Sequence, residues 1–389
     1  MSEMKDKVLR ILDDRRGETV ELLRELIMTP SPSGEEKAVA ELIAKKLRES
    51  GLENVEIDGA GNVICKITGS GRGPILLYNG HIDTVPVGDR SLWEFDPFGA
   101  EIVDDKIFGR GACDMKGSVA AILMAADAIG RADVKLRGTV ILTMVVKEEN
   151  GLQEGTKYTI EKGMLRPDIA LVGEATNLNI SLGSRGRIGV DISVKGKSAH
   201  ASNPLRGVNA IIKMTKMIEA ISNVKLPAHE FLGTTTQAVT NITCQPGKLN
   251  VIPDLCSISI DRRIIPGDTL EKTKAEFRAI IDKLKAEDPE FDADVETGKL
   301  APPAYISPTE PVVKVLQDSA EYVLGKKPEL SKYTFGTDAS YLNAVAKIPT
   351  IGFGPGDETN AHSVNDHVKI DDLVAASKVY AMFIIDLLS

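Results

Sequence analysis

The spacing of apolar residues predicts helices and strands in alternation over the first part of the chain. Residues 38–50 (AVAELIAKKLRES) carry apolar side chains at helical spacing, and the preceding Ser33-Gly34-Glu35-Glu36 has capping-box spacing. Short apolar runs at VICKI, ILLYN, TVILTMVV and IALVG predict strands, with the helical run SVAAILMAADAI among them. Several of these strands are apolar on both faces, as in a sheet covered by helices on both sides. This part therefore predicts an α/β domain.

The pattern changes near residue 185. In RIGVDISVK and CSISIDRR, apolar residues alternate with smaller or polar ones, which is typical of a sheet with one packed and one open face. The helical run NAIIKMTKMIEAI lies between these strands, and TLEKTKAEFRAIIDKLKAE follows them. Strand, helix, strands, helix, strand is the split βαβ arrangement of a ferredoxin-like module.

The chain is therefore expected to form two domains. Its 389 residues exceed what one hydrophobic core usually supports. Helix and strand signals resume after the Pro-rich loop LAPPAYISP. We expect residues 184–299 to be a domain inserted into a larger α/β domain that is built from residues 1–183 and 300–389.

Charge and cysteine content exclude several classes of partner. A net charge of −9 and a pI near 5.3 argue against nucleic acid or an anionic membrane. The first residues hold no secretory hydrophobic segment, and the apolar stretches are too short to span a bilayer. The four cysteines show no CxxC spacing, which favours reduced thiols. We expect a soluble, cytoplasmic protein.

Histidines and carboxylates follow four of the apolar strands. His81 follows ILLYNG, Glu148 and Glu149 follow TVILTMVV, Glu174 follows IALVG, and His362 lies beyond PTIGFG. In an open α/β sheet, ligands bind at the carboxyl ends of the strands. Two imidazoles and several carboxylates there suit two zinc-like ions. A carboxylate that stays off the metals could then move the proton of an attacking water.

The adjacent glutamates of VVKEENG need an explanation, because neighbouring side chains on a strand point to opposite faces. Either the chain has reached a surface turn, or the two acids have different tasks. On the second interpretation, alternation predicts that Glu149 faces the metals while Glu148 turns toward water and substrate. Neither interpretation explains Lys147, which lies just before the two glutamates.

Two further acids fit near this edge. Asp83 lies two residues after His81, where its carboxylate can bind the ring nitrogen that the metal does not use. Asp114 lies in GRGACDMKG, ahead of the helix SVAAILMAADAI. The glycines allow a sharp bend and the helix N-terminus favours an anion. The loop pattern alone fits an anion-binding loop or a capped helix.

The motifs HID, GRGACDMKG, EENG, VGEAT, GKSAHAS and AHSVND together resemble those of a co-catalytic di-zinc family, in order and spacing over nearly the whole chain. This family contains acetylornithine deacetylase, succinyl-diaminopimelate desuccinylase, aminoacylase and glutamate carboxypeptidase. The resemblance implies a zinc-dependent exopeptidase-like α/β/α catalytic domain. It also implies an inserted ferredoxin-like α+β domain that acts as a lid and forms a homodimer.

The resemblance also implies a ligand set for two Zn²⁺ ions, for which Co²⁺ or Mn²⁺ could substitute. His81 and Glu174 would bind one ion, Glu149 and His362 the other, and Asp114 would bridge them.

Three more residues acquire roles through the same resemblance. Glu148 would be the general base, and Asp83 would orient His81. His200 matches a lid histidine that stabilises the oxyanion and reaches the partner subunit's site. The family usually has an acid where this chain has Lys147, which could shift the pKa of the base.

Substrate contacts are implied at Asn241, Arg262, Gly336 and Thr337, which resemble family positions near the substrate. An arginine could hold a substrate carboxylate through two hydrogen bonds. Arg262 and its neighbour in DRR could equally be a solvated pair. The remaining histidines, His229 and His367, match no ligand position and are expected at the surface.

The main hypothesis is a zinc-dependent amidohydrolase that removes the acyl group from an N-acyl amino acid. A dipeptidase or carboxypeptidase acting on a short peptide is the nearest alternative. A metal-stabilised binding protein would leave the spare carboxylate Glu148 unexplained. A nucleotide-binding protein built on the GRG loop would explain none of the histidines.

Overall fold

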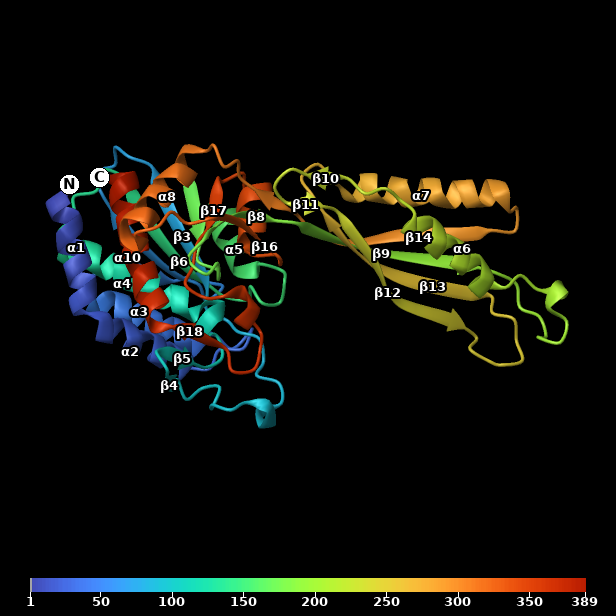
Figure 1. The fold of residues 1–389 in the computed structure, drawn as a ribbon, viewed down its shortest axis with the longest axis horizontal. Helices are drawn as coiled ribbons and strands as arrows, with labels where there is room; N and C mark the ends of the chain where they lie inside the picture. The colour runs from blue at the N-terminus through green and yellow to red at the C-terminus, as the bar shows by residue number, and fades with distance from the viewer. Residues whose placement is uncertain (1) are drawn as a thin grey trace. The chain divides into compact units, whose positions relative to one another are not determined.

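The computed structural model describes residues 2–389, which separate into two compact units (Figure 1). The first unit is Met1–Ser184 with Ala304–Ser389, and the second is Arg185–Pro303. The second unit begins one residue later and ends four residues later than the predicted insertion at 184–299. Its end lies later because the last strand continues to Ala301, which still pairs with Arg187.

A mixed nine-stranded sheet forms the centre of the first unit. Its order is β1-β2-β6-β3-β7-β17-β8-β15, with β16 beside β8. The strands are β1 (Val55–Ile57), β2 (Val63–Thr68), β3 (Ile75–His81), β6 (Thr139–Val145), β7 (Ile169–Val172), β8 (Ile180–Ser184), β15 (Ala304–Tyr305), β16 (Leu330–Tyr333) and β17 (Thr350–Gly352). The neighbours β6, β3, β7 and β17 run parallel. The predicted α/β fold class is confirmed.

Helices cover both faces of this sheet. The long helices α4 (Gly117–Arg131) and α10 (Ile370–Leu388) pack against each other on one face (Figure 1). On that face, Tyr78 of β3 meets the ring of Tyr380 edge-on, with 5.4 Å between ring centroids. The preceding residue, Leu77, belongs to a buried cluster on the other face that includes Leu342. Burial on both sides explains why ILLYN is apolar without alternation.

The other helices of the first unit are α1 (Ser2–Asp14), α2 (Arg16–Ile27), α3 (Lys37–Glu49), α5 (Glu154–Glu161), α8 (Pro311–Leu324) and α9 (Asp338–Ser340). A small sheet joins β4 (Ile102–Val103), β5 (Lys106–Phe108) and β18 (His367–Lys369). Helical turns are η1 (Arg90–Leu92), η2 (Ala112–Lys116), η4 (Tyr341–Val345) and η5 (Glu358–Asn360). Among residues 2–389, no helix is long and apolar enough to cross a membrane.

The second unit is a four-stranded antiparallel sheet with two helices on one face (Figure 1). The sheet order is β12-β13-β9-β14, so the two βαβ segments interleave as in a split βαβ arrangement. Its elements are β9 (Gly186–Lys195), η3 (Pro204–Arg206), α6 (Ala210–Ser222), β10 (Ala228–His229), β11 (Gly233–Thr234), β12 (Thr236–Gln245), β13 (Leu255–Ile264), α7 (Leu270–Glu287) and β14 (Asp292–Ala301). The alternation in β9 and β13 places their apolar side chains under α6 and α7.

Candidate active site

Four neighbouring parallel strands deliver the predicted residues to one edge of the large sheet. His81 is the last residue of β3, and Glu174 lies two residues beyond β7. Glu148 and Glu149 follow β6, and His362 lies in the segment after β17. Because β6, β3, β7 and β17 are adjacent and parallel, their carboxyl ends meet at the same edge.

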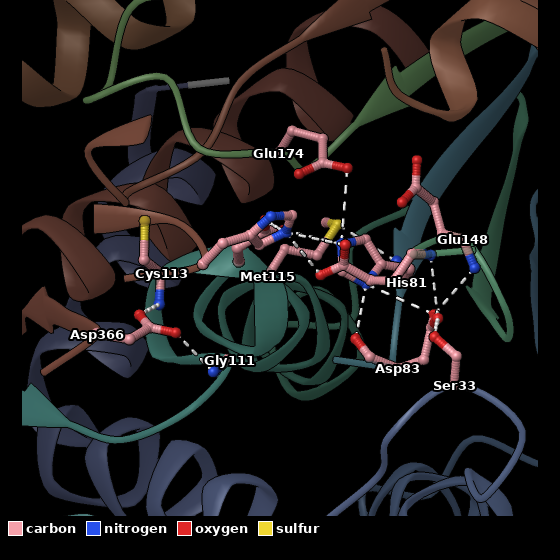
Figure 2. A network of polar contacts seen from close by, with 12 residues as sticks. Ser33, His81, Asp83, Gly111, Cys113, Met115, Glu148, Glu174 and Asp366 are labelled. Carbon is pink, nitrogen blue, oxygen red and sulfur yellow. Dashed lines mark hydrogen bonds and ion pairs between the residues drawn. The ribbon is translucent and has the colours of Figure 1, made fainter. Parts of the chain in front are cut away.

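Asp114 lies between the two histidines. Its Oδ1 is 2.9 Å from His81 Nε2, and its Oδ2 is 3.2 Å from His362 Nε2. Glu174 Oε1 lies 3.7 Å from His81 Nε2, and Glu149 Oε2 lies 2.9 Å from His362 Nε2. The five side chains therefore form two groups that share Asp114. Figure 2 shows Glu174 and His81 together in this cluster.

Glu148 is close to the same cluster. Ligand atoms of His81, Glu148 and Glu174 lie within 4.8 Å of one another, as do those of His81, Asp114 and Glu149. Only 9% of Glu148 is exposed to solvent. The alternative of a surface turn at this pair is therefore wrong, because Glu148 faces the interior. Its distance from His81 also allows it to be a metal ligand.

Loop geometry, not strand alternation, separates Glu148 from Glu149. Strand β6 ends at Val145, so the argument from alternating faces does not apply to residues 148 and 149. Lys147 adopts a left-handed conformation (φ +57°), and its N–H donates to Glu36 Oε1 at 3.2 Å. The Lys147 ammonium lies 3.5 Å from Glu154, a neighbour outside the histidine cluster.

Asp83 fixes the main chain of both glutamates. Its Oδ1 accepts the N–H of Glu148 and its Oδ2 accepts the N–H of Glu149, each at 3.0 Å. The Ser33 hydroxyl also donates to Asp83 Oδ2 at 2.6 Å, as Figure 2 shows. Ser33 is therefore not the cap of α3, which begins after Glu36 without a side-chain cap. The predicted capping box is wrong.

The ring of His81 is oriented differently from the prediction. Its Nδ1 lies 2.9 Å from the backbone carbonyl oxygen of Asp83 and 3.7 Å from the Asp83 carboxylate. The carbonyl therefore holds the ring, which leaves Nε2 for the cluster. The carboxylate is already engaged by the two backbone amides and Ser33.

A carboxylate that sequence reasoning left without a role positions Asp114. The Asp366 carboxylate accepts hydrogen bonds from the N–H groups of Gly111 and Cys113 at 2.7 and 2.9 Å. The Arg110 guanidinium lies 3.3 Å from Asp366 Oδ2. Gly111 has φ +86°, which favours glycine. The amides of the GRG loop thus bind a carboxylate of this chain, which removes the basis for a phosphate-binding loop. The motif AHSVND contains Asp366, but nothing local in it indicates that Asp366 binds the GRG loop.

The electrostatics of the cluster show an excess of negative charge. Burial raises the pKa of Glu174 well above its usual range, and Asp114 raises it further. Burial likewise raises the pKa of Glu148, which Asp338 and Glu149 raise further while His81 lowers it. Hydrogen bonds to Asp114 and Glu149 raise the pKa of His362 to about 10.

A divalent cation fits this environment. Four carboxylates converge on two imidazoles, and Glu174 Oε2 is buried without a hydrogen-bond partner. Imidazole nitrogens and carboxylate oxygens are the donors that zinc and similar ions take in catalytic sites. Positive charge here would stabilise the buried carboxylates in their ionised form.

The predicted substrate residues of the first unit lie on one loop. Gly336 is exposed, and an added Cβ there would meet nothing within 4 Å. Thr337 is buried, caps the short helix α9 through its Oγ1, and accepts a hydrogen bond from Gln153 at its carbonyl. Next to it, burial raises the pKa of Asp338 to about 6. Asp338 therefore adds to the negative charge around Glu148.

In the second unit, the two arginines of DRR lie on opposite faces of the sheet. Arg262 is 1% exposed, lies on the helix-covered face and pairs with Glu276 at 2.5 Å. Arg263 lies on the open face, where it pairs with Asp261 at 2.8 Å. The interpretation of both as a solvated pair is wrong for Arg262. The period-two alternation of β13 was the sequence signal that distinguished them.

The other predicted residue of this sheet, Asn241, is exposed on β12. His200 is also exposed, and its Nδ1 lies 2.7 Å from the hydroxyl oxygen of Ser202. His229 and His367, expected at the surface, are both half-buried. His367 packs against Phe108, with ring centroids 4.9 Å apart.

Comparison with known proteins gives a family match over most of the chain. The sequence model of the family described as "Peptidase family M20/M25/M40" matches residues 77–386 of this chain. An Escherichia coli (strain K12) protein called "Uncharacterized protein YgeY" is 34% identical over 96% of this chain and 95% of its own length. Succinyl-diaminopimelate desuccinylase 2 of Ruegeria sp. is 30% identical, covering 94% of each chain. Acetylornithine deacetylase of Photorhabdus laumondii is 29% identical over 94% of this chain and 96% of its own.

Solved structures share the fold. Aminopeptidase PepT from Bacillus cereus has a TM-score of 0.81 at 23% identity, covering 96% of this chain and 98% of its own. The Bacillus subtilis YXEP protein, described as a dinuclear metal binding peptidase, has a TM-score of 0.74 at 18% identity with the same coverage.

Proposed function

Because the chain belongs to peptidase family M20/M25/M40 and is an enzyme that hydrolyses amide bonds, we propose that it removes the acyl group from an N-acyl amino acid. The reaction would be of the acetylornithine deacetylase or succinyl-diaminopimelate desuccinylase type. The relatives with these names support the substrate class. The observation that carries the proposal is the buried carboxylate of Glu148 beside the two groups that share Asp114.

We propose that the cluster holds two Zn²⁺ ions, with Co²⁺ or Mn²⁺ as possible substitutes. His81 and Glu174 would bind one ion, Glu149 and His362 the other, and Asp114 both. When bound, such ions lower the pKa of a water and polarise the substrate carbonyl.

Glu148 is the proposed general base. Its carboxylate would accept the proton of the water that attacks the acyl carbon, and would then donate it to the leaving amine. The products are a carboxylate and a free amino acid. Burial and the negative charges of Asp338 and Glu149 raise the pKa of Glu148, which suits a group that must both take and return a proton. Asp83 holds the Glu148 main chain in place.

The second candidate is a dipeptidase or carboxypeptidase, because the peptidase names of the two solved structures support hydrolysis of a peptide bond. The two functions differ in the group next to the scissile amide. A panel of N-acetyl and N-succinyl amino acids and free-amino dipeptides, assayed with zinc- or cobalt-loaded protein, separates them. We expect turnover of the N-acyl amino acids. Hydrolysis of only the dipeptides would exclude the deacylase.

For the substrate carboxylate we propose Arg263 in place of Arg262, because only Arg263 lies on the open face of its sheet. Asn241 of the second unit remains a proposed substrate residue and is exposed. Gly336 and Thr337 of the first unit also remain proposed substrate residues, of which Gly336 is exposed and Thr337 is buried. His200 stays as the proposed oxyanion residue on the resemblance of GKSAHAS.

We propose that the first unit is catalytic and that the second acts as a lid and forms a homodimer through β12. The ten residues of this edge strand carry no charge, whereas the opposite edge strand β14 carries Asp292, Asp294 and Glu296. An uncharged free edge is a template for pairing with a second copy. Sedimentation of the protein and of Ile242→Glu tests this, and a wild-type monomer would exclude it. We also propose a cytoplasmic enzyme, which the free cysteines support.

A further inference from the structure

Two cysteines of the second unit face each other across neighbouring strands. Cys244 of β12 is paired directly with Cys256 of β13, and their Sγ atoms lie 2.9 Å apart. Both are free thiols. Directly opposite residues of an antiparallel pair have Cα atoms about 4.5 or 5.5 Å apart. Both values fall within the range of about 4.4–6.8 Å that a disulfide requires. The backbone therefore already has the spacing of a disulfide.

We propose that Cys244 and Cys256 form a site of reversible oxidation, at which a hydroperoxide converts the two thiols to an intrachain disulfide. This site is independent of the proposed amide hydrolysis, since neither cysteine belongs to the histidine cluster.

The reaction takes place in two balanced steps. Cys244 loses its proton, its sulfur attacks the peroxide and the O–O bond breaks. Cys244 becomes a sulfenic acid, and the leaving oxygen takes up the Cys244 proton and departs as water or an alcohol. The Cys256 sulfur then attacks the Cys244 sulfur, the S–O bond breaks, and a second water leaves with the Cys256 proton. The thiols lose two electrons and two hydrogens, which the peroxide receives.

The surroundings of the two thiols determine their order of reaction. Cys244 is half-buried, and its side chain packs against the helix-covered core, so it is not part of the backbone edge that would pair in the proposed homodimer. It is the more accessible of the two thiols. Cys256 is fully buried in the hydrophobic core of the unit. Burial, and then the hydrogen bond with Cys244, raise the pKa of Cys256 to about 12, so it stays protonated. Cys244 is therefore the sulfur that meets the peroxide, and Cys256 resolves the sulfenic acid.

The disulfide would have two consequences for this sheet. It would tie the edge strand β12 to its neighbour β13, the strand that it pairs with in the described sheet. It would also protect Cys244 from further, irreversible oxidation to the sulfinic acid. We expect the oxidised unit to unfold at a higher temperature than the reduced unit.

Peptide mapping without reduction tests the site on the full-length, native protein. Reduced protein is treated with hydrogen peroxide, quenched by alkylation, digested and analysed by mass spectrometry. We expect two of the four thiols to be lost and a linked Cys244–Cys256 peptide to appear. Dithiothreitol should restore all four thiols and reverse a rise of a few degrees in Tm.

Two variants give the matched comparison. Cys256→Ser should yield no linked peptide, no rise in Tm and a sulfinic acid at Cys244 under the same treatment. Cys65→Ser, which alters a buried thiol of the first unit, should form the linked peptide as the wild type does. If wild-type Cys244 is converted to the sulfinic acid or stays reduced without linking to Cys256, the proposal is wrong. A disulfide between Cys244 residues of two chains would overturn it equally.

Discussion

Asp83 holds Glu148 through the main chain and not through the side chain: Asp83 Oδ1 accepts the Glu148 N–H at 3.0 Å. The other oxygen of the same carboxylate accepts the N–H of Glu149, also at 3.0 Å. A single buried carboxylate therefore sets the positions of the proposed base and of a proposed ligand.

Replacing Asp83 should impair catalysis without removing a catalytic group. In Asp83→Asn, the amide nitrogen would face a backbone N–H, so the loop would shift. We expect kcat to fall about 10²-fold, the loss typical of a small misplacement. Steady-state kinetics with metal analysis check this. The kcat of Ser33→Ala, which removes only the hydroxyl donor, should fall much less. An Asp83→Asn enzyme with wild-type kcat would contradict the positioning role.

Glu148→Gln should separate proton transfer from metal binding. The amide cannot accept a proton, so we expect activity to fall about 10²–10⁴-fold. Metal content measured by mass spectrometry should stay at the wild-type value. Lys147→Gln is the control, because that side chain pairs with Glu154 outside the cluster, and it should be close to wild type. Loss of metal from Glu148→Gln would make Glu148 a ligand.

Removal of the metal ions should lower both activity and stability. A chelator would leave the buried carboxylates facing one another without a cation between them. A ligand that binds only the native state raises the free energy of unfolding by about 3–4 kcal/mol at saturating concentration, and removal of the metal loses this contribution. Thermal unfolding should show a lower Tm that zinc restores. Asp114→Asn should reduce metal content at both positions, since Asp114 contacts both histidines. Asp318→Asn, an exposed change on α8, should keep the metal.

The two neighbouring arginines should behave differently. Arg262→Ala removes the buried partner of Glu276, and we expect a loss of about 1–3 kcal/mol in unfolding free energy because Glu276 is partly exposed. Arg263→Ala should change stability little and raise KM for an N-acyl amino acid. Denaturant unfolding and kinetics on both variants check this. An unaltered stability of Arg262→Ala, with a raised KM, would return the substrate role to Arg262.

The acid stability of the second unit should depend on Asp288. Hydrogen bonds from Lys213 and Lys216 lower its pKa from 3.8 to about 2. Since the folded-state pKa is the lower one, Asp288 stabilises the fold above pH 4, and this contribution is lost as the pH falls toward 2. Asp288→Asn should therefore lower Tm at neutral pH, and the difference from wild type should shrink between pH 4 and 2. Asp282→Asn, on the exposed side of α7, should show no such change.

The sequence by itself determined the fold class and the strand ends from which the histidines and carboxylates project. Periodicity is local: ILLYN is apolar throughout because β3 is buried on both faces, and β13 alternates because helices cover one face. His81 and Glu174 could be related to strand ends because each lies within two residues of its own strand. Alternation also contained the difference between Arg262 and Arg263.

Only the tertiary structure decided which groups hold the cluster in place. The backbone N–H groups that Asp83 binds lie 65 and 66 residues away in sequence, and those that Asp366 binds lie more than 250 residues away. The directions of Glu148 and Glu149 depend on the left-handed backbone at Lys147 and on the hydrogen bond from the Lys147 N–H to Glu36, and not on the strand before them. Such hydrogen bonds join segments that meet only after the sheet has formed, so no local sequence pattern predicts them.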